Sequence, residues 1–357
     1  MSSAIAPGGA VAVGYARWGG VGEPFTLVDA ATPRTPGPGE VLVRVDLATV
    51  CGSDLHTVAG RRPSPAPAVL GHEQVGTVLA VGEGGARCVG GAPVAAGMRV
   101  VWSVTASCGD CDRCGRGLPQ KCRRLRKYGH EPLDEAAPLT GGFATHCVLL
   151  PGTAVVAVPD DLPDAVAAPA SCATATVAAV VAAAGPLGGR RVLVTGAGML
   201  GVTAVAMAAH AGAHVVAVDP DPARRAQAAL FGAAEVADTA PDEVDVALEL
   251  SGKPSAVTAC LRSLAVGGTV VLAGSVSPGE PVPLDPERVV RGLHTVVGVH
   301  NYRPEDLRAA VDFLSAHHRA RPFADLVEGA FGLDQVDAAF AAARTSAAMR
   351  QAIAPRR

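Results

Sequence analysis

The sequence has little lysine and no marked excess of either charge. Lys121, Lys127 and Lys253 are the only lysines among 357 residues, and arginine supplies the remaining positive charge. The formal net charge is −3, with both signs mixed along the chain. A general nucleic-acid binder, or a protein that docks on anionic membranes, needs a strongly basic surface, so this balance argues against both classes. The scarcity of lysine beside abundant Ala, Gly and Pro indicates a genomic composition bias.

The sequence also lacks a recognisable targeting segment and a long apolar run. Its N-terminus has no basic start followed by an apolar stretch, as a secretory signal has. The Ala- and Val-rich run Val177–Ala184 is too short to span a bilayer. With 49% hydrophobic and 18% charged residues, the chain is expected to fold around a sizeable core. We therefore expect a cytoplasmic protein that binds neither nucleic acid nor membranes.

Four of the nine cysteines stand close together in the run CGDCDRCGRGLPQKC. They are Cys108, Cys111, Cys114 and Cys122, separated by two, two and seven residues. Four thiolates on one short loop can close a tetrahedral shell around Zn²⁺ and leave no position for substrate. An iron–sulfur cluster is the alternative, because bacterial ferredoxin motifs begin with the same spacing. Those motifs continue with a closer fourth cysteine followed by proline, whereas Arg123 follows here, so the run favours a structural zinc.

The sequence pattern differs between the first part of the chain and the rest. Up to about residue 150, short alternating segments such as 40–50 and 76–82 are separated by Gly and Pro, which is typical of β-strands. Ala-rich helical sequence then covers 165–184. Beyond it, the strand candidates VLVTGAG, HVVAVD, VDVALEL and GTVVLAG alternate with helical sequence, which predicts a parallel sheet covered on both faces. Helical sequence returns at 305–315 and 333–344.

The run GAGMLG predicts a dinucleotide site. Its glycines, Gly196, Gly198 and Gly201, follow an apolar strand and open a helix, which is the context that this otherwise weak pattern requires. The first glycine permits a tight turn, the second lets the pyrophosphate approach the helix N-terminus, and the third lets helix and strand pack closely. Met199 and Leu200, between them, are expected to contact the cofactor as well.

The next strand candidate ends in Asp219, about 20 residues after the glycines. A carboxylate at this place can accept hydrogen bonds from the adenosine ribose and would repel a 2′-phosphate. We therefore expect NAD(H) to be preferred over NADP(H). Arg224 and Arg225 follow closely and keep NADP use open, and Arg224 is counted among the cofactor contacts.

A second set of candidate metal ligands is scattered along the chain. Cys51 opens the run CGSDLH, His72 lies in GHE, and Cys172 stands within the Ala-rich segment. Two thiolates and one imidazole would leave a fourth position for water or substrate, as in a catalytic zinc site. Isolated cysteines and histidines are also common as core residues, so the residues alone leave both interpretations open.

Taken in order, these runs resemble the zinc-dependent alcohol dehydrogenases of the medium-chain dehydrogenase/reductase family. CGSDLH, GHEQVG, the four-cysteine lobe, a cysteine before the dinucleotide unit, GAGMLG and Asp219 span nearly the whole chain. The resemblance implies an α/β fold with a GroES-like catalytic domain over residues 1–173, including a zinc lobe at about 105–125. It implies a Rossmann domain over 174–298, a return to the catalytic domain over 299–357, and a homodimer or homotetramer.

The resemblance also implies roles at the site. Cys51, His72 and Cys172 match the ligands of the catalytic zinc, so two zinc ions per chain are expected. Asp54 matches the carboxylate that orients the liganding histidine, and Glu73 matches a carboxylate beside the metal.

Three further residues match the family's proton relay and nicotinamide contact. Ser53 matches the hydroxyl that hydrogen-bonds the alcohol, His56 the outer end of the relay, and Thr176 a contact of the nicotinamide. His56 suits its place because imidazole changes charge near neutral pH. The implied reaction is hydride transfer between the nicotinamide and a small alcohol or aldehyde, with zinc as a Lewis acid.

A finer resemblance concerns the substrate. The runs CGSDLHTVAGRR, KYGHE and GVHNY are similar to those of a subgroup associated with phosphonate metabolism. Arg61, Arg62 and His300 lie in these runs and are the candidate substrate contacts, because a guanidinium binds a phosphonate dianion well. The other cationic residues of these segments are Lys127, His130 and Arg303. Clustered surface charges are usually solvated, so a hydroxyalkylphosphonate substrate is a hypothesis.

Other functions fit the same fold, since a fold does not define a substrate. A polyol or amino-alcohol dehydrogenase of the family is one alternative. A reductase of C=C or C=N bonds with only a structural zinc is another, although it would not need Ser53 and His56. A non-catalytic NAD-binding protein is the last alternative. Such a protein is expected to lack a zinc ligand or to have a blocked glycine motif, whereas this sequence retains the zinc ligands and an open glycine motif.

Overall fold

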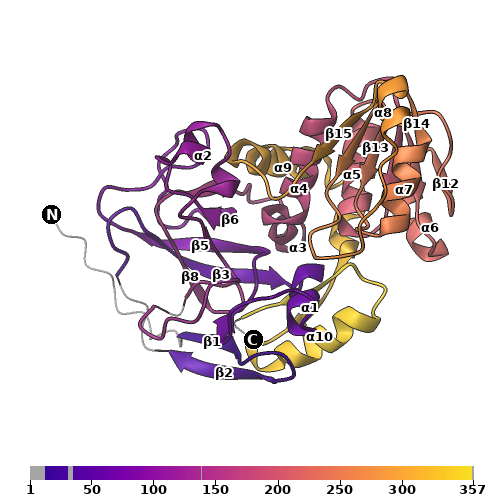
Figure 1. Ribbon diagram of the computed structural model, residues 1–357. Helices are drawn as coiled ribbons and strands as arrows, with labels where there is room; N and C mark the ends of the chain where they lie inside the picture. The colour runs from indigo at the N-terminus through magenta and orange to yellow at the C-terminus, as the bar shows by residue number, and fades with distance from the viewer. Residues whose placement is uncertain (1–12, 31–34, 138, 356–357) are drawn as a thin grey trace.

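The computed structural model describes residues 13–30, 35–137 and 139–355, which form two parts that each surround a β-sheet (Figure 1). The first part combines the N-terminal half of the chain with its C-terminal end. The second part lies between these segments in sequence and carries most of the helices.

A curled mixed sheet of eight strands is the framework of the first part. Its strands are β3 (Val41–Thr49), β5 (Gln74–Val81), β6 (Arg99–Ala106), β7 (Arg126–Lys127), β8 (His146–Leu149), β9 (Thr153–Ala157), β16 (Val327–Phe331) and β17 (Arg350–Ile353). The order is β16-β17-β3-β5-β6-β7, while β8 pairs with β3 and β9 pairs with β6. In β3, Val43 and Val45 are buried and Arg44 and Asp46 are partly exposed, as the two-residue period of a strand requires.

A smaller sheet and four short helices complete this part. The small sheet has the order β2-β1-β4 and consists of β1 (Val13–Trp18), β2 (Phe25–Ala30) and β4 (Ala68–Val69). The helices are α1 (Gly52–Val58), α2 (Asp112–Gly115), α3 (Asp164–Ala167) and α10 (Val336–Thr345). Near the chain end, Ala352 of β17 pairs with Thr49 of β3, which returns the C-terminal strand to the start of α1.

The second part is a parallel sheet of six strands. The strands are β10 (Arg191–Thr195), β11 (His214–Val218), β12 (Glu235–Ala237), β13 (Val244–Glu249), β14 (Leu264–Leu272) and β15 (Thr295–Gly298). They are ordered β12-β11-β10-β13-β14-β15. This is the order of two βαβ halves that meet between β10 and β13, where ligands bind beyond the carboxyl ends of the strands.

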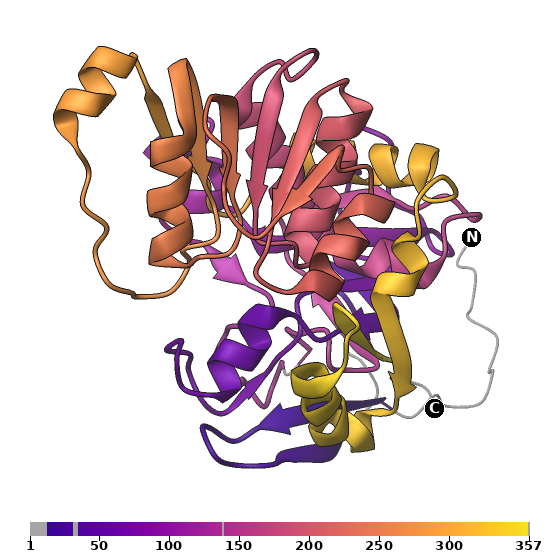
Figure 2. The same ribbon diagram turned by 90° about the vertical axis from the view of Figure 1, so that its right-hand side faces the viewer.

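The four strands predicted from the sequence in this part are confirmed, and two were missed. The missed strands, β12 and β15, have only three and four residues and lie at the two edges of the sheet, so each run is too short to stand out from the sequence around it. The helices of the region are α4 (Ala173–Ala184), α5 (Met199–His210), α6 (Pro222–Leu230), α7 (Pro254–Ser263), α8 (Pro286–Gly292) and α9 (Pro304–His317). Figure 2 shows α8 projecting from the sheet at the end of a long loop.

The predicted helix over 165–184 is broken. It consists of α3, the 3₁₀ helix η2 (Ala168–Ser171) and α4, with Cys172 at the break. Among the described residues, no single helix is long and apolar enough to cross a membrane, and only the bent combination 164–171 with 173–184 passes a test of length and composition.

The two parts share one apolar core. Val101 and Val104 of β6, Val177 of α4 and Leu307 of α9 belong to the same buried cluster, which continues beneath the parallel sheet. Side chains from both sheets therefore meet around α4, directly after Cys172.

Candidate active site

The four clustered cysteines converge on one point. They sit around α2 and the 3₁₀ helix η1 (Pro119–Lys121), and their sulfur atoms lie within 4.8 Å of one another. The Sγ–Sγ distances are 3.5 Å from Cys111 to Cys114, 4.0 Å from Cys111 to Cys122 and 3.3 Å from Cys122 to Cys108. Tetrahedral Zn²⁺ with Zn–S bonds of about 2.3 Å separates its sulfur ligands by about 3.8 Å, so the donor set fits a zinc ion.

Backbone groups of this lobe favour the thiolate form. The N–H groups of Cys108 and Arg124 both donate to Cys122 Sγ at 3.3 Å. Backbone donation from Arg123 and then Cys114 lowers the pKa of Cys111 to about 6, whereas burial raises the pKa of Cys114 and contact with Asp110 raises that of Cys108. Deprotonated sulfurs are what a metal requires.

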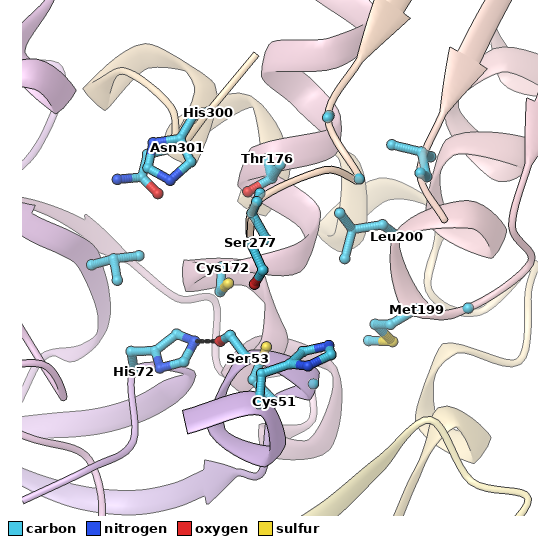
Figure 3. A pocket seen from close by; sticks show the side chains of 18 of the residues that line it. Cys51, Ser53, His72, Cys172, Thr176, Met199, Leu200, Ser277, His300 and Asn301 are labelled. Atoms are coloured by element: carbon cyan, nitrogen blue, oxygen red, sulfur yellow. Dashed lines mark hydrogen bonds between the residues drawn. The ribbon is translucent and has the colours of Figure 1, made fainter. Parts of the chain in front are cut away.

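Cys51, His72 and Cys172 are also brought together, although they lie far apart in sequence. Cys51 follows β3 and precedes α1, His72 lies between β4 and β5, and Cys172 stands at the break before α4. Their ligand atoms lie within 4.8 Å of one another, and Figure 3 shows the two sulfur atoms and the ring near Ser53. Two sulfurs and a nitrogen at this spacing fit a tetrahedral metal with one open position.

The ring of His72 is held from both sides. Its Nδ1 lies 3.3 Å from Asp54 Oδ1, and its Nε2 lies 3.0 Å from Ser53 Oγ (Figure 3). Asp54 is fully buried and also accepts a hydrogen bond from the Cys51 backbone N–H at 2.9 Å. Burial disfavours the charged imidazole, but Asp54 and then Cys51 outweigh it and raise the pKa of His72 to about 10. Asp54 therefore orients the ring while tying together the two segments that carry ligands.

Glu73 lies beside Cys51, His72 and Cys172, which we call the triad. It takes part in an ion pair that the sequence did not indicate. Its two carboxylate oxygens accept hydrogen bonds from Arg350 Nε at 2.6 Å and Nη2 at 2.9 Å, and Thr49 Oγ1 donates to Oε2 at 2.8 Å. Arg350 Nη2 also lies 3.6 Å from Cys51 Sγ. Contact with Cys172 and the charge of Arg350 oppose burial, and together they hold the pKa of Cys51 well below its usual value. Arg350 thus neutralises Glu73 and favours a thiolate at Cys51.

A second unpredicted network fixes the segment before Cys172. Ser171 Oγ accepts from the Gln74 backbone N–H at 3.2 Å and contacts the His72 carbonyl at 3.3 Å. The buried Tyr302 hydroxyl donates to the Ser171 carbonyl and accepts from Val104 N–H at 3.0 Å. These contacts connect the sites of two ligands to the segment that leaves the parallel sheet after β15.

A cleft of about 270 Å³ opens onto the triad. Ser53 and His56, both on α1, line it, as do Arg62 and His300. Lys127 and His130 line it too, and the His130 ring lies 5.0 Å from that of His72. Burial, followed by Arg61, lowers the pKa of His56.

Two predicted cationic contacts lie outside this cleft. Arg61 is exposed and is absent from the lining among the described residues. Arg303 caps α9, where its Nε lies 3.5 Å from Asp306 Oδ2. Adjacent positions in a loop point in different directions, so the doublet Arg61–Arg62 delivers only one guanidinium to the cleft.

The glycine motif has the predicted geometry. Gly196 has φ +87°, and a Cβ there would lie 2.8 Å from Ser251, while a Cβ on Gly201 would lie 1.8 Å from the Gly196 carbonyl oxygen. At Gly198 the space is open, with Arg224 Nη1 at 3.8 Å as the nearest atom to such a Cβ. A bulky side chain at Gly198 would fill the place that a pyrophosphate takes at a helix N-terminus, so this turn fits a dinucleotide.

The cofactor candidates surround the opposite side of the same cleft. Thr176, Gly198, Met199 and Leu200 line it together with Ser251, and Figure 3 shows Met199 and Leu200 across the opening from His300. The sequence did not single out Ser251, which lies in the loop after β13, although the strand order predicts that this loop meets the glycine turn.

Asp219 lies at the end of β11 with both carboxylate oxygens in backbone hydrogen bonds. Oδ2 accepts from Ala197 N–H in the glycine turn at 2.8 Å, and Oδ1 accepts from Asp221 N–H at 2.9 Å. Arg225 donates to the Asp219 carbonyl at 2.8 Å. Arg224 lies near the glycine turn, so a carboxylate and a guanidinium both face the predicted adenosine region.

Comparison with known proteins agrees with this architecture. Residues 37–160 match the alcohol dehydrogenase GroES-like domain, and residues 200–316 match the zinc-binding dehydrogenase family. The chain is 30% identical to 5-exo-hydroxycamphor dehydrogenase of Pseudomonas putida, over 89% of this chain and 92% of that protein. It is 32% identical to L-threonine 3-dehydrogenase of Streptomyces avermitilis, over 88% and 91% of the two chains.

Solved structures agree as well. A zinc-binding dehydrogenase from Sinorhizobium meliloti, bound to NADP, superposes with a TM-score of 0.84 at 26% identity and covers 97% of this chain and all (100%) of its own. A GroES-like part, to which the C-terminal strand β17 returns, and a Rossmann-like part thus make up the fold.

Proposed function

Because this chain belongs to the zinc-dependent alcohol dehydrogenases of the medium-chain dehydrogenase/reductase family, we propose that it oxidises a small anionic alcohol, such as a hydroxyalkylphosphonate, or reduces the corresponding aldehyde. The observation that carries the substrate class is the charge of the cleft. Arg62 and Lys127 line it, and no Asp or Glu does among the described residues. Cations without counter-charges in a partly desolvated cleft favour an anionic ligand.

The residues of the triad divide the work of the reaction. Cys51, His72 and Cys172 would hold the zinc, and Asp54 fixes the ring of His72. The zinc supplies Lewis acidity toward an alcohol oxygen, and the nicotinamide supplies the hydride acceptor. Ser53 Oγ contacts His72 Nε2 and lines the cleft, so its hydroxyl would take the alcohol proton while releasing its own. His56, on the same helix and in the same cleft, is the proposed acceptor of the released proton.

The second metal site has a structural role. Cys108, Cys111, Cys114 and Cys122 supply four ligands and leave no position for substrate, so we expect two zinc ions per chain. All nine cysteines are free, which suits a reducing compartment such as the cytoplasm.

NAD(H) is the proposed cofactor. Asp219 is buried at the end of β11 and already contacts the glycine turn, so a 2′-phosphate there would meet a carboxylate. Arg224 lies close enough to the turn to reduce this discrimination, and some NADP use is expected.

The domain division and the assembly are also proposals. Residues 1–173 and 299–357 form the catalytic domain and 174–298 the coenzyme domain, because β17 returns to β3 while β10 to β15 form the parallel sheet. A homo-oligomer joins through β15, an edge strand flanked by the exposed apolar side chains Val290 and Leu293, both 71% accessible. A second copy of the same strand can extend the sheet.

An amino-alcohol dehydrogenase is the second candidate, since a threonine dehydrogenase is among the relatives. Such a substrate carries an ammonium group, which is expected to need a carboxylate partner. No carboxylate lines the cleft among the described residues, so the anionic alcohol is favoured.

The test compares Arg62 with its neighbour. Arg62→Ala is expected to raise KM for 2-hydroxyethylphosphonate about tenfold, the loss of one charge-assisted hydrogen bond, and to leave KM for ethanol nearly unchanged. Arg61→Ala removes the same charge one position earlier, outside the cleft, and is expected to change neither value by more than about twofold. Equal effects of the two variants, or faster turnover of L-threonine than of the phosphonate, would reject the anionic substrate.

A further inference from the structure

The four-cysteine lobe reaches the substrate cleft through one contact. Lys121 Nζ lies 2.6 Å from His300 Nδ1, across 179 positions of sequence. Lys121 belongs to η1, directly before Cys122, whereas His300 follows β15 and lines the cleft. A residue of the structural metal lobe therefore touches a residue that faces substrate.

The lobe fixes the position of Lys121. Its backbone N–H donates to the Leu118 carbonyl at 3.0 Å, and its own carbonyl accepts from Arg113 Nη1 at 3.0 Å. The next residue, Cys122, is one of the four converging thiols. The backbone of Lys121 is thus held by the same turns that place the ligands of the lobe.

His300 is anchored from its other side. Asn301 adopts a left-handed backbone with φ +55°, and the hydroxyl of Tyr302 is bonded to Val104 and Ser171. This places His300 on a short, fixed segment beside the triad.

The chemistry of the contact determines which nitrogen of His300 carries the proton. A lysine ammonium only donates, so Nδ1 must accept and the proton of a neutral imidazole resides on Nε2. We propose that Lys121 is a positioning residue that fixes His300 as an Nε2–H donor to the anionic group of the substrate, which makes the four-cysteine lobe part of substrate recognition. The inference rests on the proposed anionic substrate.

Charge and burial agree with a neutral His300. Burial, followed by Lys121, Lys127 and Arg62, lowers the pKa of His300 to about 4. Together with Arg62 and Lys127, the Nε2–H group of His300 supplies the several donors that a tetrahedral anion binds. Among the described residues, Nε2 of His300 has no other partner.

The first experiment measures binding without turnover. Methylphosphonate is titrated into the zinc-loaded enzyme with NADH, and its Kd is compared between the wild type, Lys121→Met and Arg116→Met. Arg116 is an exposed cation of the same lobe and does not line the cleft. We expect Kd to rise about tenfold in Lys121→Met, as for one hydrogen bond to a charged group, and less than about twofold in Arg116→Met. Equal shifts in both variants would mean that only the surface potential matters, and the inference would be wrong.

A second readout tests the contact independently of any substrate. Spectra of ¹⁵N-histidine protein, with His300→Gln to assign the signal, should show His300 protonated at Nε2 in the wild type and a mixture of tautomers in Lys121→Met. Zinc content should stay the same in all variants, because Lys121 is not a ligand. A wild-type mixture of tautomers would overturn the inference even if methylphosphonate binds. If the tautomer is as expected but the wild type does not bind methylphosphonate, the anionic substrate and the recognition role both fail.

Discussion

At the scale of single residues, the buried pair of Glu73 and Arg350 supports the ligands of the triad. Glu73 is fully buried, and burial raises its pKa to about 7 even though Arg350 opposes the shift. The pair is bidentate and reaches Cys51, so it couples the C-terminal strand to the metal ligands. A buried ion pair gains little over an apolar pair, but loss of one partner is costly because the other charge is left without compensation.

We therefore expect Arg350→Met to lower the free energy of unfolding by about 1–3 kcal/mol, because the Glu73 carboxyl loses two hydrogen-bond donors and, with its pKa already raised, must bind a proton. The double variant Arg350→Met/Glu73→Gln should recover part of this loss, because the amide is neutral without taking up a proton. Urea unfolding provides the measurement. Arg303→Met, which removes a half-exposed ion pair with Asp306, is the control and should cost less than about 1 kcal/mol. Losses of similar size in Arg350→Met and Arg303→Met would contradict the role given to the buried pair.

Lys127 gives the cleft a pH dependence. Burial, followed by Arg62, lowers its pKa to about 8. Its positive charge is thus present below that pH and lost as pH rises through it, well before an ordinary lysine at about 10.4. Methanesulfonate keeps a constant charge and should inhibit ethanol oxidation with a Ki that rises roughly tenfold between about pH 7 and pH 9.5. Lys127→Arg should flatten this profile because a guanidinium stays charged, and a flat profile in the wild type would contradict the prediction.

At the scale of elements, the interruption of one helix places a ligand. Cys172 has φ −131° and ψ −68°, which ends η2 and begins α4 in a new direction. The sequence predicts a single helix there, because both pieces are rich in Ala and Val and buried nearly all round. Periodicity cannot reveal a break when no polar face marks the turn. The break is enforced by distant contacts of Ser171 with His72, Gln74 and Tyr302.

Local patterns can be predicted from the sequence, whereas contacts between distant segments cannot. The glycine turn and the four-cysteine lobe are local patterns, and both fold as their spacing indicates. The triad needed the family resemblance, because its members come from three separate segments. Arg350 and Lys121 were missed, since their partners lie 277 and 179 positions away. Arg350 stands in no motif, and Lys121 lies in the four-cysteine run without being one of its ligands.

Substitutions in the glycine turn can separate a loss of NADH binding from a loss of stability. Gly198→Val meets open space in the protein, so the free energy of unfolding should change by less than about 1 kcal/mol while NADH binding is lost. Gly201→Val must push apart helix α5 and the turn, because its Cβ would lie 1.8 Å from the Gly196 carbonyl oxygen, and should destabilise by more than about 2 kcal/mol. Fluorescence titration with NADH and thermal unfolding measure the two effects. Normal NADH affinity in a folded Gly198→Val protein would place the cofactor elsewhere.

At the scale of the whole molecule, two parts are fixed around one cleft. The shared core around α4 lies directly behind Cys172, and Tyr302 and Arg350 both come from segments that return from the coenzyme side to the catalytic side. The walls of the cleft are thus supplied by both parts, and the cleft lies where the chain crosses between them. The β15 edge of the parallel sheet is far less covered.

That edge gives the final prediction. Val296 on β15 is 43% exposed and Leu293 just before it 71%, and an uncovered edge strand with apolar neighbours is a template for pairing. Leu293→Lys/Val296→Lys should convert the oligomer to a smaller species by light scattering, because two copies would bring like charges together at a symmetric contact. Leu230→Lys places the same charge on an equally exposed apolar site of α6, 62% accessible and remote from the edge, and should leave the mass unchanged. Zinc content should be the same in all variants, since neither Leu293 nor Val296 is a proposed ligand. If both sets of variants keep the wild-type mass, β15 is not a subunit contact and the proposed pairing through this edge is wrong.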